Sequence, residues 1–302
     1  MSTIKNYLSL VKFSHTIFAM PFAMIGFFLA VLRPAMQLPI SAATPVGWQQ
    51  WLIKLALVIG CMITARSAAM GFNRYLDRHF DALNPRTAIR EIPAGIISAD
   101  HALWFVMANC LLFVVFAGLL NRLCLFLSPV ALFVVLGYSY TKRFTALCHI
   151  ILGIGLSLAP IGAYIAVTNH FALLPLLFSF AVVCWVSGFD IIYAMQDEEF
   201  DRGQQLHSIP AALGKTKALR VSEFLHLLSA SIVVIAGIVG VFGYWYWIGV
   251  AVFAGMLVYQ HSIVKPNDLS RVNIAFMTAN GVASVVFAVF VIVDLFWQPL
   301  SV

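Results

Sequence analysis

Long runs of hydrophobic residues dominate this chain and are separated by short polar segments. Nine such runs lie at about 14–32, 51–72, 101–120, 123–140, 147–168, 171–194, 218–240, 245–263 and 273–297. Each run approaches the ~20 residues that an α-helix needs to cross the hydrocarbon core of a bilayer. The pattern predicts an all-α, polytopic membrane protein with nine transmembrane helices, formed by a single membrane-embedded domain over residues 1–302.

Composition supports the same fold class. Hydrophobic residues make up 62% of the 302 residues and charged residues only 10%, which is too little polar surface to cover a soluble globule of this size. The five cysteines all lie in the apolar runs, and no C-x-x-C pair occurs among them. They are therefore interpreted as small core residues, because disulfide frameworks and zinc sites have other spacings.

The distribution of charge predicts how the chain is oriented. Most of the 18 Lys and Arg residues lie at the amino terminus or in the second, fourth, sixth and eighth loops, whereas Arg33, Lys54 and Arg122 lie on the other side. Short basic loops stay in the cytoplasm, so we expect a multi-pass protein of the cell (inner) membrane with a cytoplasmic amino terminus. No basic stripe with interleaved aromatic residues indicates nucleic-acid binding, and nothing in the sequence indicates an obligate protein partner.

One stretch at the end of the second run carries a regular set of oxygen ligands. Asn73, Asp77 and Asp81 are spaced four residues apart, so an α-helix places their side chains on one face. Amide and carboxylate oxygens suit hard cations such as Mg²⁺ or Ca²⁺. Arg66 lies seven residues before Asn73 on the same face and deeper in the predicted span, and charges at such depth usually line a polar cavity.

The acidic spacing returns later in the chain. Asp77-x-x-x-Asp81 recurs as Asp197-x-x-x-Asp201, with Phe before the second Asp and an Ile-Pro-Ala downstream in both copies. We interpret this as an internal repeat of about 14–140 and 147–263, followed by a final helix at 273–297. Both copies follow an even-numbered run, so both acidic loops are expected on the cytoplasmic face, opposite each other across one central cavity.

Further polar residues accompany the second copy and the loops. Asp190 precedes Asp197 by seven residues, as Arg66 precedes Asn73, and Tyr193 lies near the same face. A deep Arg opposite a deep Asp has two interpretations: the two side chains bind a small polar molecule, or they neutralise each other.

A set of cations lies close to both acidic copies. It comprises Arg86, Arg90, Lys142 and Arg143, the last two following Tyr138 at the end of a run. Arginine and lysine suit phosphate oxygens, so acidic and basic clusters together indicate a metal-bridged polyphosphate.

Other chemistries find little support in the sequence. No G-x-S-x-G elbow, Walker A sequence or H-E-x-x-H motif is present. Internal repeats and buried charges also occur in secondary transporters, which remain a distant alternative. A four-helix offset keeps the two copies parallel, however, and the aspartates lie at a cytoplasmic mouth.

The motifs resemble those of a known family. N-x-x-x-D-x-x-x-D at Asn73, Asp77 and Asp81, with D-x-x-Y-x-x-x-D-x-x-x-D from Asp190 to Asp201, is similar to the paired motifs of the UbiA superfamily of intramembrane aromatic prenyltransferases. The resemblance covers nearly the whole chain and implies nine helices around a central cavity with a cytoplasmic cap. One departure is Arg74, where many members have Asp.

The resemblance also implies roles for the candidate residues. The implied Mg²⁺ ligands, which would bridge the diphosphate of a polyprenyl diphosphate, are Asn73, Asp77, Asp81, Asp197 and Asp201. Those implied to bind its oxygens are Arg86, Arg90, Lys142 and Arg143. Arg66 matches a position near the carboxylate of an aromatic acceptor. Those implied to line the same cavity are Tyr138, Asp190 and Tyr193, and those implied to act in catalysis are Asp77, Asp190, Asp197 and Lys142.

The identity of the acceptor stays open at the level of sequence. The segments GFNRYLDRHFDALNPRTAIREIPAG and GYSYTKRFT resemble a bacterial branch described as 4-hydroxybenzoate polyprenyltransferase-like. A 4-hydroxybenzoate-type acceptor in ubiquinone biosynthesis is favoured, and 1,4-dihydroxy-6-naphthoate in futalosine-route menaquinone biosynthesis is the alternative. Prenylation of a haem or chlorin is a third possibility, which would need a larger acceptor cavity.

Overall fold

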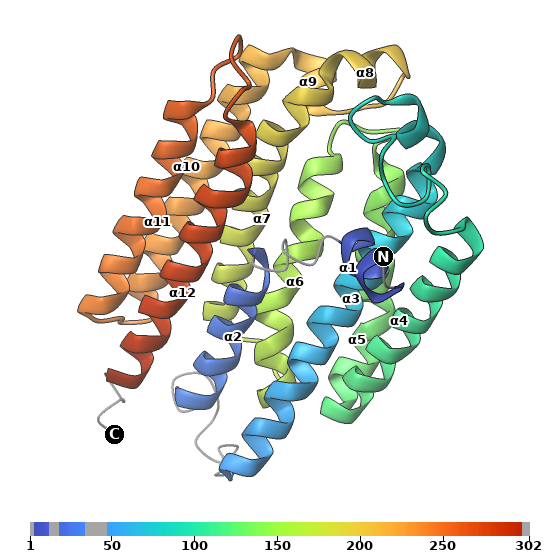
Figure 1. The fold of residues 1–302 in the computed structure, drawn as a ribbon. Coiled ribbons are helices and arrows are strands. Elements are labelled where there is room, and N and C mark those ends of the chain that lie inside the picture. The colour runs from blue at the N-terminus through green and yellow to red at the C-terminus, as the bar shows by residue number, and fades with distance from the viewer. Residues whose placement is uncertain (1–2, 12–17, 34–46, 298–302) are drawn as a thin grey trace.

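The computed structural model describes residues 3–11, 18–33 and 47–297 and is built almost entirely of helices (Figure 1). The α-helices are α1 (Thr3–Leu10), α2 (Met20–Leu32), α3 (Trp48–Leu83), α4 (Ala99–Leu120), α5 (Arg122–Thr141), α6 (Cys148–Thr168), α7 (Leu173–Ala194), α8 (Glu198–Gly203), α9 (Ile209–Leu213), α10 (Lys215–Val239), α11 (Tyr244–Ile263) and α12 (Asn280–Trp297). A 3₁₀ turn at Met195–Asp197 follows α7, and a π-helical turn at Ile274–Ala279 precedes α12.

The predicted membrane fold is confirmed. Within the described ranges, eight helices are long and apolar enough to cross a membrane, and α2 is a shorter apolar helix of 13 residues. Helix α2 corresponds to the first predicted run, whose beginning at 14–17 lies outside the described residues, as do Lys12 and residues 34–46. The predicted break between the runs at 101–120 and 123–140 is also correct, because α4 ends at Leu120 and Asn121 caps α5 by accepting a hydrogen bond from the Cys124 amide.

The long helices form a bundle in which consecutive spans are neighbours. Helix α2 completes the arrangement by packing against α6 and α12. The approach of α2 to α6 is close at Gly26, where a Cβ atom would lie 2.0 Å from the Pro160 carbonyl oxygen. Both acidic segments reach the same end of the bundle, where α8, α9 and residues 84–98 form a cap (Figure 1).

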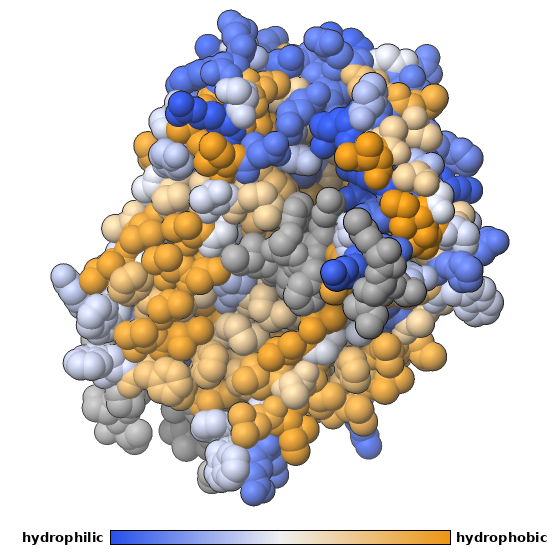
Figure 2. Space-filling model, in the orientation of Figure 1, coloured by the Kyte–Doolittle hydropathy of each residue, from blue (hydrophilic) through white to orange (hydrophobic). Residues whose placement is uncertain are grey.

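The surface agrees with insertion into a bilayer. Figure 2 shows hydrophilic residues gathered over the cap and a broad band of hydrophobic residues across the helices below it. Large apolar side chains that point outward from α5 include Phe126 and Phe133, both more than two-thirds exposed in the isolated chain. Such exposure is expected where lipid covers the protein, and it would be unusual over so wide an area of a soluble monomer.

At the end opposite the cap, a buried ion pair links three parts of the bundle. Arg33, at the end of α2, lies 3.9 Å from Asp294 of α12 and donates to the Gly240 carbonyl oxygen. Asp294 also accepts hydrogen bonds from the Gly243 and Tyr246 amides at the start of α11. These contacts fasten α2 and α12 to the α10–α11 turn, and the hydrogen bonds satisfy charges that would be costly to bury alone.

Candidate active site

A polar cavity of about 450 Å³ lies beneath the cap, between the cap-side ends of α3 and α7. Nearly all the residues singled out in the sequence line it: Arg66, Asn73, Asp77, Asp81, Arg86, Arg90, Tyr138, Lys142, Asp190, Tyr193, Asp197 and Asp201. They come from α3, residues 84–98, α5 and the residue after it, α7, the 3₁₀ turn at Met195–Asp197, and α8. The two acidic segments, 120 residues apart (197 minus 77), therefore face one cavity.

The first acidic segment keeps its ligands on one face because α3 continues as a single helix to Leu83. Asn73 donates its side-chain amide to Asp77 Oδ2 at 3.0 Å, which leaves the Asn73 side-chain oxygen as an acceptor. The helix stops at Asn84, whose extended backbone begins the cap. The Asn84 side chain then reaches across the cavity and donates to Asp197 Oδ1 at 3.2 Å.

The second acidic segment is built differently. Helix α7 ends at Ala194, and the 3₁₀ turn at Met195–Asp197 separates it from α8. Asp197 and Asp201 therefore share a cavity but do not belong to one uninterrupted α-helix. The four-residue spacing of the aspartates is the same in the two copies, but the backbone that carries it differs.

Asp190 is paired with a residue other than Arg66. His149 Nδ1 lies 2.6 Å from Asp190 Oδ2, and His149 Nε2 accepts a hydrogen bond from the Ile209 amide at 3.3 Å. The Ile209 bond makes Nδ1 the donor to Asp190. Among the described residues, no hydrogen bond or ion pair involves Arg66. Neutralisation of Arg66 by Asp190, one of the two interpretations of the sequence, is therefore not what the structure shows.

Each of the four cavity aspartates Asp77, Asp81, Asp197 and Asp201 forms an ion pair with one of the predicted cations, and that of Asp77 is with Arg143. Arg90 Nη1 lies 2.6 Å from Asp81 Oδ1, and Lys142 Nζ lies 2.8 Å from Asp201 Oδ1. Arg86 donates through Nε to Asp197 Oδ1 at 3.0 Å, and its Nη2 contacts Asp197 Oδ2. The pairs of Arg86 and Lys142 join the two halves of the sequence, so they hold the acidic segments in register across the cavity.

The same contacts keep the cations charged. Burial disfavours the Lys142 ammonium, but the neighbouring Asp201 carboxylate outweighs burial and raises the pKa of Lys142. Burial likewise opposes the charge of Arg86, and its hydrogen bonds to Asp197 nevertheless raise its pKa. For Asp77 burial prevails over the attraction of Lys142 and raises the pKa of the carboxyl group. A divalent cation would favour the ionised form of Asp77.

Arg143 is the one predicted substrate-binding residue that does not line the cavity. Its guanidinium donates to the Leu76 carbonyl oxygen at 3.0 Å and lies 3.4 Å from Asp77 Oδ1. It also lies over the rings of Phe80 and Tyr140. Arg143 therefore contacts Asp77 from outside the cavity lining. Its contact with a substrate stays a prediction.

The acidic residues fit Mg²⁺ in their donor chemistry. Within the described residues, no three His, Cys, Asp or Glu side chains form a ready metal cluster. The buried Asp81 Oδ2 atom nevertheless has no hydrogen-bond partner. Mg²⁺ is typically held by one or two carboxylates and completed by substrate phosphates and water. The carboxylates here face a cavity and do not surround a cation by themselves. They therefore leave room for the phosphates and water that complete the coordination of Mg²⁺.

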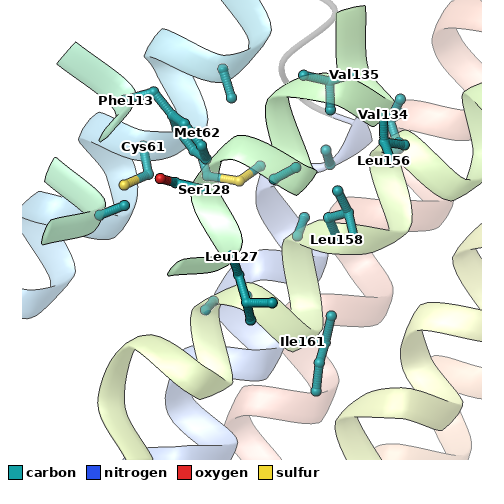
Figure 3. Close-up of a pocket in the computed structure, with 18 of the residues that line it drawn as sticks. Cys61, Met62, Phe113, Leu127, Ser128, Val134, Val135, Leu156, Leu158 and Ile161 are labelled. Carbon is teal, nitrogen blue, oxygen red and sulfur yellow. The ribbon is translucent and has the colours of Figure 1, made fainter. Parts of the chain in front are cut away.

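A second, apolar cavity of about 320 Å³ lies between α3, α4, α5 and α6. Figure 3 shows Cys61 and Met62 of α3, Phe113 of α4, and side chains of α5 and α6 around this space. The two cavities share the lining residues Arg66, Met70, Tyr138, Leu152 and Leu156. The polar site thus leads directly into an apolar space within the membrane-spanning part of the bundle.

Sequence reasoning did not identify every polar residue of the cavity. His149, Asn84 and Arg74 line the cavity, but the sequence assigned none of them a role in the site. Arg74 lines the cavity and is 5% exposed. The Asn before Pro85 and the Arg beside Asn73 were visible in the sequence, but only the folded chain shows that these side chains face the same space.

An all-helical membrane bundle with a charged, diphosphate-suited cavity that opens into an apolar one defines an intramembrane enzyme acting on an amphiphilic phosphate ester. The family comparison agrees: residues 20–282 match the model of the UbiA prenyltransferase family. The chain belongs to this family, and the predicted membrane-embedded prenyltransferase is confirmed.

Similar proteins with a named activity are 4-hydroxybenzoate octaprenyltransferases. The chain is 31% identical over 253 residues to a 4-hydroxybenzoate octaprenyltransferase from Nitrosospira multiformis, covering 81% of this chain and 87% of the relative. It is 29% identical over 254 residues to a protein of the same name from Coxiella burnetii, covering 80% and 87%. These names describe transfer of an octaprenyl group to 4-hydroxybenzoate by those proteins.

Solved structures share the fold. A UbiA homologue from Aeropyrum pernix in its apo form superimposes with a TM-score of 0.76 and 28% identity, over 95% of this chain and 98% of that one. A UbiA homologue from Archaeoglobus fulgidus bound to GPP and Mg²⁺ gives a TM-score of 0.69 at 18% identity, over 96% and 99%. The second likeness concerns the fold alone.

Proposed function

We propose that this protein transfers a polyprenyl group from a polyprenyl diphosphate to an aromatic carboxylate of the 4-hydroxybenzoate type, with Mg²⁺ and in a quinone pathway. The observation that carries the proposal is the junction of the two cavities at Arg66 and Tyr138. A donor with a charged head and an apolar tail needs one polar and one apolar space in contact. Names of the relatives support 4-hydroxybenzoate as the acceptor.

The donor's diphosphate would lie among the aspartates and cations of the polar cavity. The proposed ligands of Mg²⁺ are Asn73, Asp77, Asp81, Asp197 and Asp201. Bound there, Mg²⁺ would neutralise charge on the diphosphate as a Lewis acid. Arg86, Arg90 and Lys142 would exchange part of their contacts with carboxylates for contacts with phosphate oxygens, so that the same cations stabilise the departing group.

The reaction then follows from the placement of the two substrates. The bond between allylic C1 and the diphosphate oxygen breaks, and the electron pair leaves with the diphosphate. A ring carbon of the acceptor forms the new bond to C1 and loses its proton. Asp190, which His149 holds in place, is proposed to accept a hydrogen bond from the phenol and to accept the proton that the ring carbon loses. Tyr138 and Tyr193 line the site where the allylic cation develops.

Arg66 is the proposed binding residue for the acceptor carboxylate. It lies at the junction of the cavities, and no carboxylate among the described residues pairs with it. A planar guanidinium binds a carboxylate through two parallel hydrogen bonds. 1,4-Dihydroxy-6-naphthoate carries the same carboxylate and hydroxyl groups, so it remains the second acceptor to compare.

The orientation in the membrane is also part of the proposal. The cap carries Arg86, Arg90 and Arg202, and Lys142 and Arg143 directly follow α5 at the same end of the bundle. These basic residues favour the cytoplasmic side of the inner membrane. The polar cavity would then open toward the cytoplasm, where a charged diphosphate and a small aromatic acid are both available.

Purified protein in detergent tests the proposal. The assay supplies Mg²⁺, a labelled polyprenyl diphosphate and either 4-hydroxybenzoate or 1,4-dihydroxy-6-naphthoate, and product is followed by chromatography. Prenylated benzoate with released diphosphate is expected, and Arg66→Gln should raise the KM for the acceptor. If neither acid is prenylated while the protein remains folded, the proposed reaction is wrong. Product from the naphthoate alone would change the acceptor and keep the reaction class.

A further inference from the structure

We infer that Arg74, on α3, binds phosphate oxygens of the donor's diphosphate as a further anion-binding residue of the polar cavity. The inference rests on the proposed function, because it assigns a ligand to the same site. Arg74 lies beside Asn73 and three residues before Asp77, and all three line the cavity. The side chain is 5% exposed, so it belongs to the interior and not to the surface.

Arg74 differs from most cations around it in having no partner. Arg86, Arg90, Lys142 and Arg143 each contact an aspartate of the cavity. Among the described residues, by contrast, the Arg74 side chain forms no ion pair or hydrogen bond, and its buried Nε atom has no acceptor. A buried guanidinium without an acceptor is costly, and an anion bound in the cavity would remove that cost.

Charged groups of both signs act on the Arg74 side chain, yet none of them pairs with it. The charges that act on it are those of Arg90, which repels it, and of Asp81 and Glu91, which attract it. Asp81 is already bound by Arg90 at 2.6 Å, and Glu91 accepts a hydrogen bond from Ser9 of α1. Each carboxylate thus has a donor on one oxygen, and although Asp81 Oδ2 and Glu91 Oε2 have no hydrogen-bond partner, neither bonds to Arg74, whose own donors remain available.

The position of Arg74 along α3 selects the diphosphate as its ligand. Eight residues separate Arg66 from Arg74, which is about 12 Å along an α-helix. Arg66 lines both cavities, whereas Arg74 lines only the polar one. Arg74 is thus level with the proposed metal ligands, and Arg66 lies deeper, where the acceptor is proposed to bind. Two unpaired arginines at two depths correspond to two separate anions.

The experiment compares Arg74→Gln and Arg74→Lys with Arg78→Gln. Arg78 is a matched control on the same helix: it donates to the Tyr75 carbonyl oxygen, lies over the Tyr75 ring and lines neither cavity. The measurements are the dissociation constant of inorganic pyrophosphate with Mg²⁺, by calorimetry on the purified protein, and KM values for the prenyl diphosphate and for the acceptor separately.

We expect Arg74→Gln to weaken pyrophosphate binding and to raise the donor KM by about 10- to 100-fold. Arg74→Lys should be intermediate, because lysine keeps the charge and loses the planar fork. The acceptor KM of Arg74→Gln and all values for Arg78→Gln should stay within about twofold of the parent, because Arg74 lies away from the proposed acceptor site and Arg78 lines neither cavity. A merely structural role of Arg74 would not separate the two KM values.

Several outcomes overturn the inference: unchanged pyrophosphate affinity in Arg74→Gln, an increase confined to the acceptor KM, or a parent protein that binds no pyrophosphate. If Arg74→Gln does not fold, Arg74→Lys decides, and parent-like pyrophosphate affinity in that variant rejects the assignment. Failure of the proposed function is a different result. A parent that binds pyrophosphate through Arg74 but prenylates neither acceptor would reject the reaction and keep the anion site.

Discussion

The two sides of the helical bundle are equally apolar in sequence but are filled very differently. On the side of α7, α10, α11 and α12, together with α2, large aromatic rings interlock: Phe287 of α12 lies within 6 Å of the rings of Phe22, Tyr246 and Phe253. On the side of α3, α4, α5 and α6 lies the apolar cavity. In the most apolar 18-residue stretch of Leu173–Gly203, which contains α7, 61% of the residues are buried. In that of α5, only 11% are buried.

Side-chain size explains the difference. The packed side contributes Trp185, Phe178 and Phe253 to its interior, whereas the hollow side lines its cavity with small residues such as Ala65, Ala69, Ala131, Gly155 and Gly162. Hydrophobicity alone therefore does not distinguish a core from a binding space. One side holds the bundle together, and the other provides room for an apolar substrate chain.

The largest expected effect comes from the acidic segments, to which both sides contribute one copy. Asp77→Asn on α3 and Asp197→Asn after α7 should each lower kcat/KM by at least about 100-fold, because each removes a proposed metal ligand. Asp268→Asn, in an exposed loop that does not line the cavity, is the control and should behave like the parent. Steady-state prenyl transfer measures the effect. Loss in only one of the two variants would contradict a shared site.

The next effect tests the packed side. Phe287→Ala should lower the free energy of unfolding by about 3–5 kcal/mol, because it removes a fully buried ring from the aromatic cluster. Phe133→Ala on α5 removes the same ring where it is 78% exposed. Its effect should be below about 1 kcal/mol. Denaturant titration in detergent, or the shift in Tm, compares the two. Equal destabilisation by both substitutions would mean that the α7–α12 side is not the core.

A smaller effect should appear when the hollow side is filled. Gly162→Leu places a side chain in the apolar cavity, where a Cβ atom meets nothing within 4 Å. We expect the ratio of kcat/KM for a long donor to that for a ten-carbon donor to fall about 10- to 100-fold.

Gly137→Leu on α5 is the matched control for that experiment. Its Cβ would also meet nothing within 4 Å, and Gly137 lines neither cavity. The donor ratio should therefore match that of the parent. A parent-like ratio in Gly162→Leu as well would indicate that the donor's chain leaves the site by another route.

Much of the site was predictable from local pattern. The four-residue spacing of Asn73, Asp77 and Asp81 places three side chains on one face of any α-helix, and α3 does continue through them. The recurrence at Asp197 and Asp201 indicated one shared cavity, which the structure contains. Division of the chain into two repeats and a final helix stays a prediction.

Contacts between distant segments were not predictable in the same way. The partner of Asp190 is His149, 41 positions away, because α6 and α7 pack side by side. The 3₁₀ turn before α8 also departs from the helical spacing that the sequence indicates. No periodicity in the sequence encodes such choices, since they depend on which faces of two helices meet.

The sequence by itself determined the membrane fold, the number of apolar runs and the ligands offered to a diphosphate, because hydrophobic length and helical spacing are local properties. The tertiary structure decided which cations neutralise which aspartates, and it left Arg66 and Arg74 without a carboxylate partner among the described residues. It also decided which side of the bundle is hollow. Charge pairing and void space depend on side-chain volume and approach between helices far apart in the chain, which only packing sets.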